Sequence, residues 1–154
     1  MDELLTPEQR DLKSRAREVA EKYVRPQAAE LDRTGEYPYK IMEKIIEYGL
    51  MGVWIPKEYG GKGLGVLELC LVVEELSKAC GGVGVGFAVN ALGSFPIMIG
   101  GNEEQKQTYL RDVATGKKFI AFALSEKESG SDAGSLKAKA WKDGDGYIID
   151  GDKK

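Results

Sequence analysis

Apolar residues recur every three to four positions in the first part of the chain, which predicts an amphipathic helix. Thr6, Pro7 and Gln9 form a capping box with proline at the first helical position, so we expect the helix to begin there. Pro26 should kink or restart this helix, which then runs on toward Leu31. The apolar stripe consists of Leu12, Ala16, Val19, Ala20, Tyr23 and Val24.

The same periodicity predicts four further helices. Pro38 opens the second, with isoleucines and a methionine facing inward and an end at Gly49. The third runs from about Val66 to Ala79, and its apolar residues lie almost all round, so it should be central in the bundle. A glycine-rich fourth helix covers roughly Val83–Ile99, and a fifth begins at a capping box on Asn102.

Residues 51–65, MGVWIPKEYGGKGLG, separate the second and third helices. Val53–Ile55 is too short for a confident strand, and the four glycines from Gly60 to Gly65 predict a flexible turn. The glycines do not have the spacing of a dinucleotide-binding fingerprint, and no good strand precedes them. We therefore do not interpret this segment as a dinucleotide-binding fingerprint.

After the helices the pattern changes to short runs typical of strands. Phe119–Leu124 is apolar and bounded, which predicts a buried strand, and Leu136–Ala140 alternates with lysines as a second strand. KDGDGYIIDG predicts a hairpin into a third strand, which is left short with an unpaired edge. We predict a mainly α fold: an up-and-down helical bundle (1–117), then the start of a small antiparallel β domain (118–154). We expect this incomplete α+β chain to be a fragment of a longer protein.

Composition excludes several kinds of chemistry. The net charge is −3, and no basic run suggests nucleic acid as a partner. Histidine is absent, which removes the commonest general base and metal ligand. The DGDG stretch is not a calcium loop, because Tyr147 and Lys154 stand where oxygen ligands are needed, so we expect no metal. Glu74 and Glu75 are expected to form one solvated helix face rather than a catalytic pair.

The cysteines and the apolar segments predict a soluble cytoplasmic protein. Cys70 and Cys80 lack CxxC spacing, and we expect them to be buried, reduced thiols. The N-terminus has no apolar signal region. Gly81–Ile99 is long enough to cross a membrane, but its glycines, Asn90 and Pro96 favour a buried helix of a soluble bundle.

Residues 122–135, FALSEKESGSDAGS, are the strongest candidate for chemistry. A hairpin loop needs two to five residues. This segment instead places about ten small, hydroxylated and charged residues between two predicted strands. Its backbone N–H groups and the hydroxyls of Ser125 and Ser131 are neutral donors. Such donors suit a planar heterocycle that gains electron density on reduction. From the residues alone, an elaborate loop without a ligand is an equal alternative.

The chain resembles the N-terminal part of the acyl-CoA dehydrogenase family from Leu5 to its last residue. The resemblance is carried by LTPEQRDLKSRAREVAEKYVRPQAAELDRTGEYP, GLMGVWIPKEYGGKGLG, LGSFPIMIGGNEEQKQTYL and AFALSEKESGSDAGSLKAKA with DGYIIDGDKK. It implies a helical N-terminal domain, a middle β domain and a C-terminal helical bundle. This chain would hold the first domain and the opening strands of the second.

The resemblance also implies site residues. The positions that match flavin contacts are Phe122, Leu124, Ser125, Gly130 and Ser131. Ser131 also matches a substrate contact, and Val89 and Leu92 on the fourth helix match the wall of the acyl pocket, although helix packing explains the nearby glycines equally well. Glu126 and Asp132 match acidic positions, expected to be structural. Lys127 and Glu128 replace the family's Pro-Gly turn, which leaves the loop geometry open.

The function implied by the resemblance is FAD-dependent α,β-dehydrogenation of an acyl-CoA thioester. The family's carboxylate base lies in the C-terminal bundle, so no catalytic residue is expected here and the chain alone should be inactive. Electron-transfer flavoprotein is expected as the acceptor, and the longer protein is expected to be a homo-oligomer. The alternatives are a helical binding or assembly module without flavin, or a related acyl-CoA oxidase or flavin monooxygenase.

Overall fold

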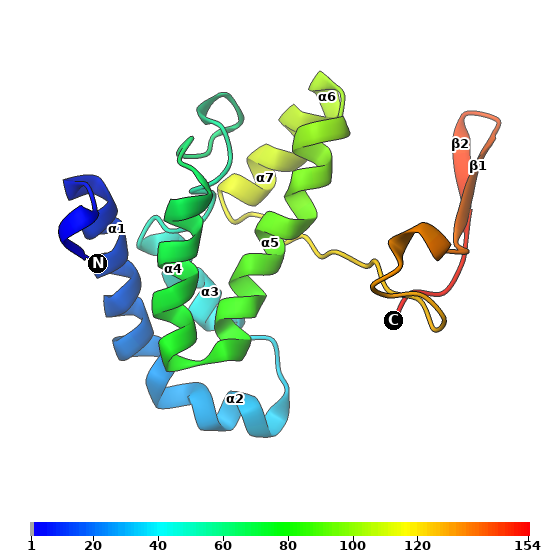
Figure 1. Cartoon of the computed structure of the whole chain (residues 1–154). Helices are drawn as coiled ribbons and strands as arrows, with labels where there is room; N and C mark the ends of the chain where they lie inside the picture. The colour runs from blue at the N-terminus through cyan, green and yellow to red at the C-terminus, as the bar shows by residue number, and fades with distance from the viewer. Residues whose placement is uncertain (1) are drawn as a thin grey trace. The chain divides into compact units, whose positions relative to one another are not determined.

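The computed structural model describes residues 2–154, which form two compact units (Figure 1). The first unit extends to Ala121 and the second begins at Phe122. The first is helical and the second contains an antiparallel strand pair, which confirms the predicted fold class. The division into domains 1–117 and 118–154 stays a prediction.

The first unit contains all the α-helices of the described chain. A π-helical turn (Ala20–Val24) and a 3₁₀ turn (Arg25–Gln27) join the first two helices, and another π-helical turn (Lys106–Leu110) joins the last two. The helices are α1 (Pro7–Val19), α2 (Ala28–Thr34), α3 (Tyr39–Glu47), α4 (Val66–Ala79), α5 (Gly81–Gly100), α6 (Glu103–Gln105) and α7 (Arg111–Ala114).

The capping box predicted at the start of α1 is present. The Thr6 hydroxyl accepts from the Gln9 backbone N–H at 3.2 Å, and the Gln9 side chain accepts from the Thr6 N–H at 2.9 Å. Pro26 lies in the 3₁₀ turn after which α2 begins, so the predicted restart is confirmed. The proline has no N–H to donate, and the backbone therefore changes its hydrogen-bonding pattern there.

Helix α4 is central, as predicted, because it packs against both α1 and α5 (Figure 1). The prediction for Glu75 is wrong. Its side chain is only 2% exposed, whereas that of Glu74 is 48% exposed. Successive helix residues point about 100° apart. Glu75 is therefore turned toward α1, where Arg17 donates to its carboxylate at 2.9 and 3.2 Å.

The segment between α3 and α4 is ordered rather than the predicted flexible turn. The backbone N–H groups of residues 61–64 all donate to carbonyls of residues 52–56, at 2.8–3.1 Å. Val53 and Ile55 are fully buried. Trp54 donates to the Ser94 hydroxyl at 2.8 Å and meets the Phe87 ring edge-on at 5.7 Å. Backbone pairing and apolar burial together immobilise this glycine-rich segment, which contains no strand.

Helix α5 can pack closely against α4 because Gly84 of α5, which has no side chain, faces Ser77 of α4. A Cβ on Gly84 would stand 2.0 Å from the Ser77 hydroxyl. By length and composition α5 could also span a membrane, with 39% of its most apolar window buried in the unit. A core helix passes the same test, so its interpretation as a bundle helix rests on its packing against α4.

The expectation that both cysteines are buried is wrong. Cys70 on α4 is exposed, and Cys80 is only partly buried at the junction of α4 and α5. Cys70 is exposed although its sequence neighbours on α4, Leu69 and Leu71, are buried. An apolar helical context is therefore not enough to bury each residue within it.

The second unit contains the predicted hairpin. Strands β1 (Lys139–Asp143) and β2 (Gly146–Asp150) are antiparallel, and Gly144 takes a left-handed conformation (φ +57°) in the turn. The prediction of a strand at Phe119–Leu124 is wrong. The strand predicted at Leu136–Ala140 begins only at Lys139, as β1, so residues 136–138 lie outside it. A strand needs a hydrogen-bonded neighbour. Within residues 2–154, β1 and β2 pair only with each other.

Candidate functional site

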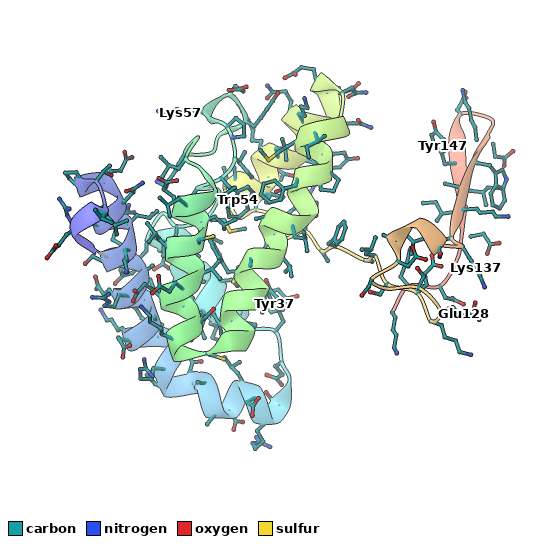
Figure 2. All side chains as sticks on the ribbon, viewed as in Figure 1. Tyr37, Trp54, Lys57, Glu128, Lys137 and Tyr147 are labelled. Carbon is teal, nitrogen blue, oxygen red and sulfur yellow. The ribbon has the colours of Figure 1, made fainter. Side chains whose placement is uncertain are left out.

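The predicted flavin loop begins the second unit and folds around a tight turn. Glu126 N–H donates to the Ser129 carbonyl at 2.7 Å, and Ser129 N–H donates back at 3.4 Å. Lys127 and Glu128 form the exposed tip of this turn. The turn therefore closes without the Pro-Gly pair of the family. Of the two added charges, Glu128 forms an ion pair with Lys137 (Figure 2).

The serines of the loop divide into two kinds. Ser129 is buried and donates to the Asp132 carbonyl at 2.5 Å, while Ser135 donates to the Asp132 carboxylate. Ser125 and Ser131 are exposed, and within residues 2–154 their hydroxyls have no hydrogen-bond partner. Two hydroxyls therefore stabilise the loop, and two remain available to a ligand.

The structure brings Ser125 and Gly130 together on the loop. A Cβ on Gly130 would lie 4.0 Å from the Ser125 hydroxyl oxygen, so this glycine leaves space beside the hydroxyl. Leu124 is partly buried and Phe122 is exposed. The five predicted flavin contacts thus lie within ten residues of one loop, which offers two unpaired hydroxyls and a side-chain-free position.

Glu126 ties this loop to two later segments. Its carboxylate accepts from the backbone N–H groups of Lys137 and Ala138 at 2.7 and 2.9 Å, and from the Lys153 ammonium at 2.8 Å. The hydrogen bond from Lys153, followed by those from the two backbone groups, lowers the pKa of Glu126 to about 2. The carboxylate therefore stays ionised at neutral pH, and it acts here as an acceptor rather than as an acid or base.

The two predicted acyl-pocket residues lie in the first unit, on α5. Leu92 is exposed and Val89 is partly buried, and they share a face with the exposed Val85 and Ile99 at helical spacing. Three of these four apolar side chains are exposed, and only Val89 is partly covered. Of the glycines nearby, Gly84 is explained by the packing of α5 against α4.

Asn90, on another face of α5, is a buried polar residue that the sequence reasoning did not assign to the site. Its amide donates to the Gly86 carbonyl at 3.0 Å, and its oxygen accepts from the Ile120 N–H at 3.1 Å. One turn later, a Cβ on Gly93 would stand 3.0 Å from the Ala121 carbonyl. Residues 119–121 therefore lie directly against α5. A polar side chain inside an apolar helix was the signal that could have identified Asn90.

We expect Asn90→Leu to lower the free energy of unfolding of the first unit by about 2 kcal/mol, because the Ile120 N–H loses its acceptor. Urea unfolding and amide hydrogen exchange measure the two effects. Ser94→Ala is the matched control, since it removes another buried polar group of α5, bound to Trp54. Faster exchange at Ile120 is expected in the Asn90 variant alone, and unchanged exchange there would contradict this role.

A cavity of about 360 Å³ lies in the first unit, where the end of α2 and the following loop meet the start of α5. Gly86 lines it, whereas Val89 and Leu92 do not. Burial raises the pKa of the lining Tyr37, although a hydrogen bond with Asn90 opposes this change. The cavity therefore reaches α5 at Gly86, one turn before Val89. Within residues 2–154, no group of three possible metal ligands is present.

Residues 6–117 match the family model described as acyl-CoA dehydrogenase, N-terminal domain. The chain is 43% identical over 150 residues to a probable acyl-CoA dehydrogenase of Bacillus subtilis, covering 97% of this chain and 40% of the relative. It is 44% identical over 154 residues to a short-chain-specific acyl-CoA dehydrogenase of Clostridium acetobutylicum, covering 99% and 41%.

Among solved structures, the chain is similar to an acyl-CoA dehydrogenase of Bacillus anthracis complexed with FAD. The TM-score is 0.89 at 35% identity, and the match covers 98% of this chain and 26% of that one. The chain thus spans about 40% of the length of the curated relatives that it matches. With the family model matching most of its residues, this chain belongs to the acyl-CoA dehydrogenase family.

Proposed function

We propose that this chain is the N-terminal part of a longer FAD-dependent enzyme that removes hydrogen from Cα and Cβ of an acyl-CoA thioester. The observation that carries the proposal is the pair of exposed hydroxyls, Ser125 and Ser131, that no protein group engages in residues 2–154. Membership of the family supports the reaction class. The Bacillus anthracis relative, solved as a complex with FAD, supports the cofactor.

The residues of the loop fit a flavin because they offer neutral donors beside a side-chain-free position. Ser125 and Ser131 would donate hydrogen bonds to ring carbonyls or nitrogens, and Phe122 and Leu124 would contact the apolar ring edge. When bound, FAD supplies an acceptor for the hydride that leaves Cβ. Neutral hydroxyl donors stabilise negative charge on such a ring without releasing a proton freely. Ser131 would also contact the thioester.

The acyl chain would lie along the apolar stripe of α5 that includes Val89 and Leu92. Burial of a hydrocarbon chain against these side chains contributes about 0.8 kcal/mol per CH₂. The carboxylate that removes the α-proton belongs to the part of the enzyme outside these 154 residues.

We also propose electron-transfer flavoprotein as the electron acceptor, a homo-oligomeric assembly and a cytoplasmic location.

A flavin spectrum and a dye-reduction assay test this function. We expect the full-length protein that contains this chain to be yellow, with flavin absorption bands, and to reduce an electron-accepting dye when given an acyl-CoA. The 154-residue chain alone is expected to show no turnover, because the base is not within it. A colourless, folded full-length protein that does not bind added FAD would instead support a binding or assembly module.

We expect Ser131→Ala in the full-length protein to weaken FAD binding by about tenfold, since one hydrogen bond to the ring is lost. Titration of the apoprotein with FAD measures the affinity. Ser14→Ala, which changes an exposed serine on α1, is the matched control and should bind FAD as the unaltered protein does. Equal affinity of the two variants for FAD would show that Ser131 does not contact the flavin.

A further inference from the structure

Glu126 joins three separate stretches of the second unit through one carboxylate. One oxygen, Oε2, accepts from the Lys137 backbone N–H. The other, Oε1, accepts from both the Ala138 N–H and the Lys153 ammonium. Two backbone donors and one cation thus converge on a side chain that is 9% exposed. Such charge-assisted hydrogen bonds are about twice as strong as neutral ones.

The same contacts extend to the backbone of the loop. The Lys153 ammonium also donates to the Leu124 carbonyl at 3.0 Å, and the Lys154 N–H donates to the Ser125 carbonyl at 2.8 Å. The carbonyls of both residues just before Glu126 are therefore held by the segment that follows β2. The Ser125 carbonyl is thus engaged, whereas its hydroxyl has no hydrogen-bond partner within residues 2–154.

We infer that Glu126 is the positioning residue of the flavin loop: its carboxylate holds Leu124 and Ser125 in place through Lys153 and through the backbone of residues 137 and 138. This inference rests on the proposed function, because it concerns the loop that would bind FAD. Glu126 itself does not act on the substrate. It acts through Ser125, whose hydroxyl it keeps at a defined place.

A glutamine cannot take over this role. It has one oxygen acceptor, and its NH₂ group would face a backbone N–H donor or the Lys153 ammonium. Glu128, two residues later, is the matched control. It is exposed, its carboxylate pairs with the Lys137 side chain, and it accepts from no backbone N–H group within residues 2–154. The two carboxylates thus differ in what they hold while sharing the same loop.

The test compares Glu126→Gln, Glu128→Gln and Lys153→Met in the full-length protein. We expect Glu126→Gln to weaken FAD binding at least about tenfold and to shift the flavin absorption bands, because the donors around the ring move. Lys153→Met should give a smaller change of the same kind, since the two backbone contacts of Glu126 remain. Glu128→Gln should keep the affinity within about twofold and leave the spectrum unchanged.

The outcomes separate this inference from the proposed function. If the unaltered protein binds no flavin, the proposed function fails and this inference fails with it. If it binds flavin and Glu126→Gln has the same affinity and spectrum, the inference alone is overturned. Should Glu126→Gln not fold, Lys153→Met decides: a weakened affinity with shifted bands supports the inference, and unchanged binding overturns it.

Discussion

Replacing Gly61 with alanine is expected to unfold the first unit or to destabilise it by at least ~3 kcal/mol. A Cβ on Gly61 would stand 2.0 Å from the Ile55 carbonyl oxygen and 2.6 Å from the Ile55 Cβ. Ile55 cannot withdraw, because it is fully buried and its carbonyl accepts from the Gly63 N–H at 2.8 Å. The clash therefore falls on the backbone of an ordered segment.

Urea unfolding followed by tryptophan fluorescence measures this effect. In a Trp141→Phe background the signal comes from Trp54, which is buried in the first unit. Gly81→Ala is the control: nothing lies within 4 Å of its Cβ, and in the first turn of α5 the change should be neutral or stabilising by less than ~1 kcal/mol. Similar free energies of unfolding for the two variants would show that the backbone at residue 61 moves to accommodate the Cβ, which would contradict the prediction.

Glu75→Gln is expected to destabilise the first unit by about 3 kcal/mol. The change keeps the shape of the side chain but removes the charge that faces three cations. Arg17 donates to this carboxylate at 2.9 Å, Lys78 donates at 2.8 Å, and the Lys13 ammonium lies at 3.7 Å. Because the carboxylate is buried, loss of its charge is not compensated by water.

Glu74→Gln is the matched control for this prediction. Glu74 is the neighbouring residue, pairs with Lys78 at 2.7 Å and is half exposed. Exposed ion pairs contribute about 0–1 kcal/mol, so this variant should unfold almost as the unaltered chain does. Equal losses in the two variants would contradict the assignment of Glu75 as the buried centre of the cluster.

The dependence of stability on pH follows from the same residue. Burial raises the pKa of Glu75, but hydrogen bonds from Arg17 and Lys78 outweigh it and lower the pKa to about 2, from an ordinary 4.5. A carboxyl with a lowered pKa stabilises the folded state above its unfolded pKa. Its contribution should therefore be complete above about pH 4.5 and be lost as the pH falls toward about 2. The difference in unfolding free energy between Glu75→Gln and the unaltered chain should shrink over that range.

Sequence reasoning placed the helices well because their signals are local. The bounds of α4 match the prediction, and the capping boxes at Thr6 and Asn102 are both present. The hairpin turn at Gly144 was also predicted correctly. Caps, helix breakers and turn glycines act through residues three or four positions apart, so a short stretch of sequence contains the whole signal.

The errors arise where a distant segment decides the outcome. Glu75 was expected to be exposed to solvent, but it is buried and accepts a hydrogen bond from Arg17, 58 positions away in the sequence. Phe119–Leu124 has the composition of a strand, but within residues 2–154 no neighbouring strand pairs with it. The glycines of residues 60–65 suggested flexibility, which backbone hydrogen bonds to residues 52–56 remove.

The candidate site shows the same division. The sequence named Ser125 and Ser131 through the family resemblance, but it could not tell them from Ser129 and Ser135, whose hydroxyls the loop uses internally. It also singled out Glu126 without its partner Lys153, 27 positions later. Hydrogen bonds between residues so far apart in the sequence depend on the tertiary fold. The composition of the loop does not predict them.

By itself, the sequence determined the helical class of the first unit, most of its helix boundaries, the β hairpin and the family. Only the tertiary structure decided which carboxylate is buried, which serines are engaged and how residues 50–65 are held. The physical reason is range. Helix caps and turns satisfy backbone groups within a few residues, whereas burial and ion pairing depend on which distant side chains the packed helices bring into contact.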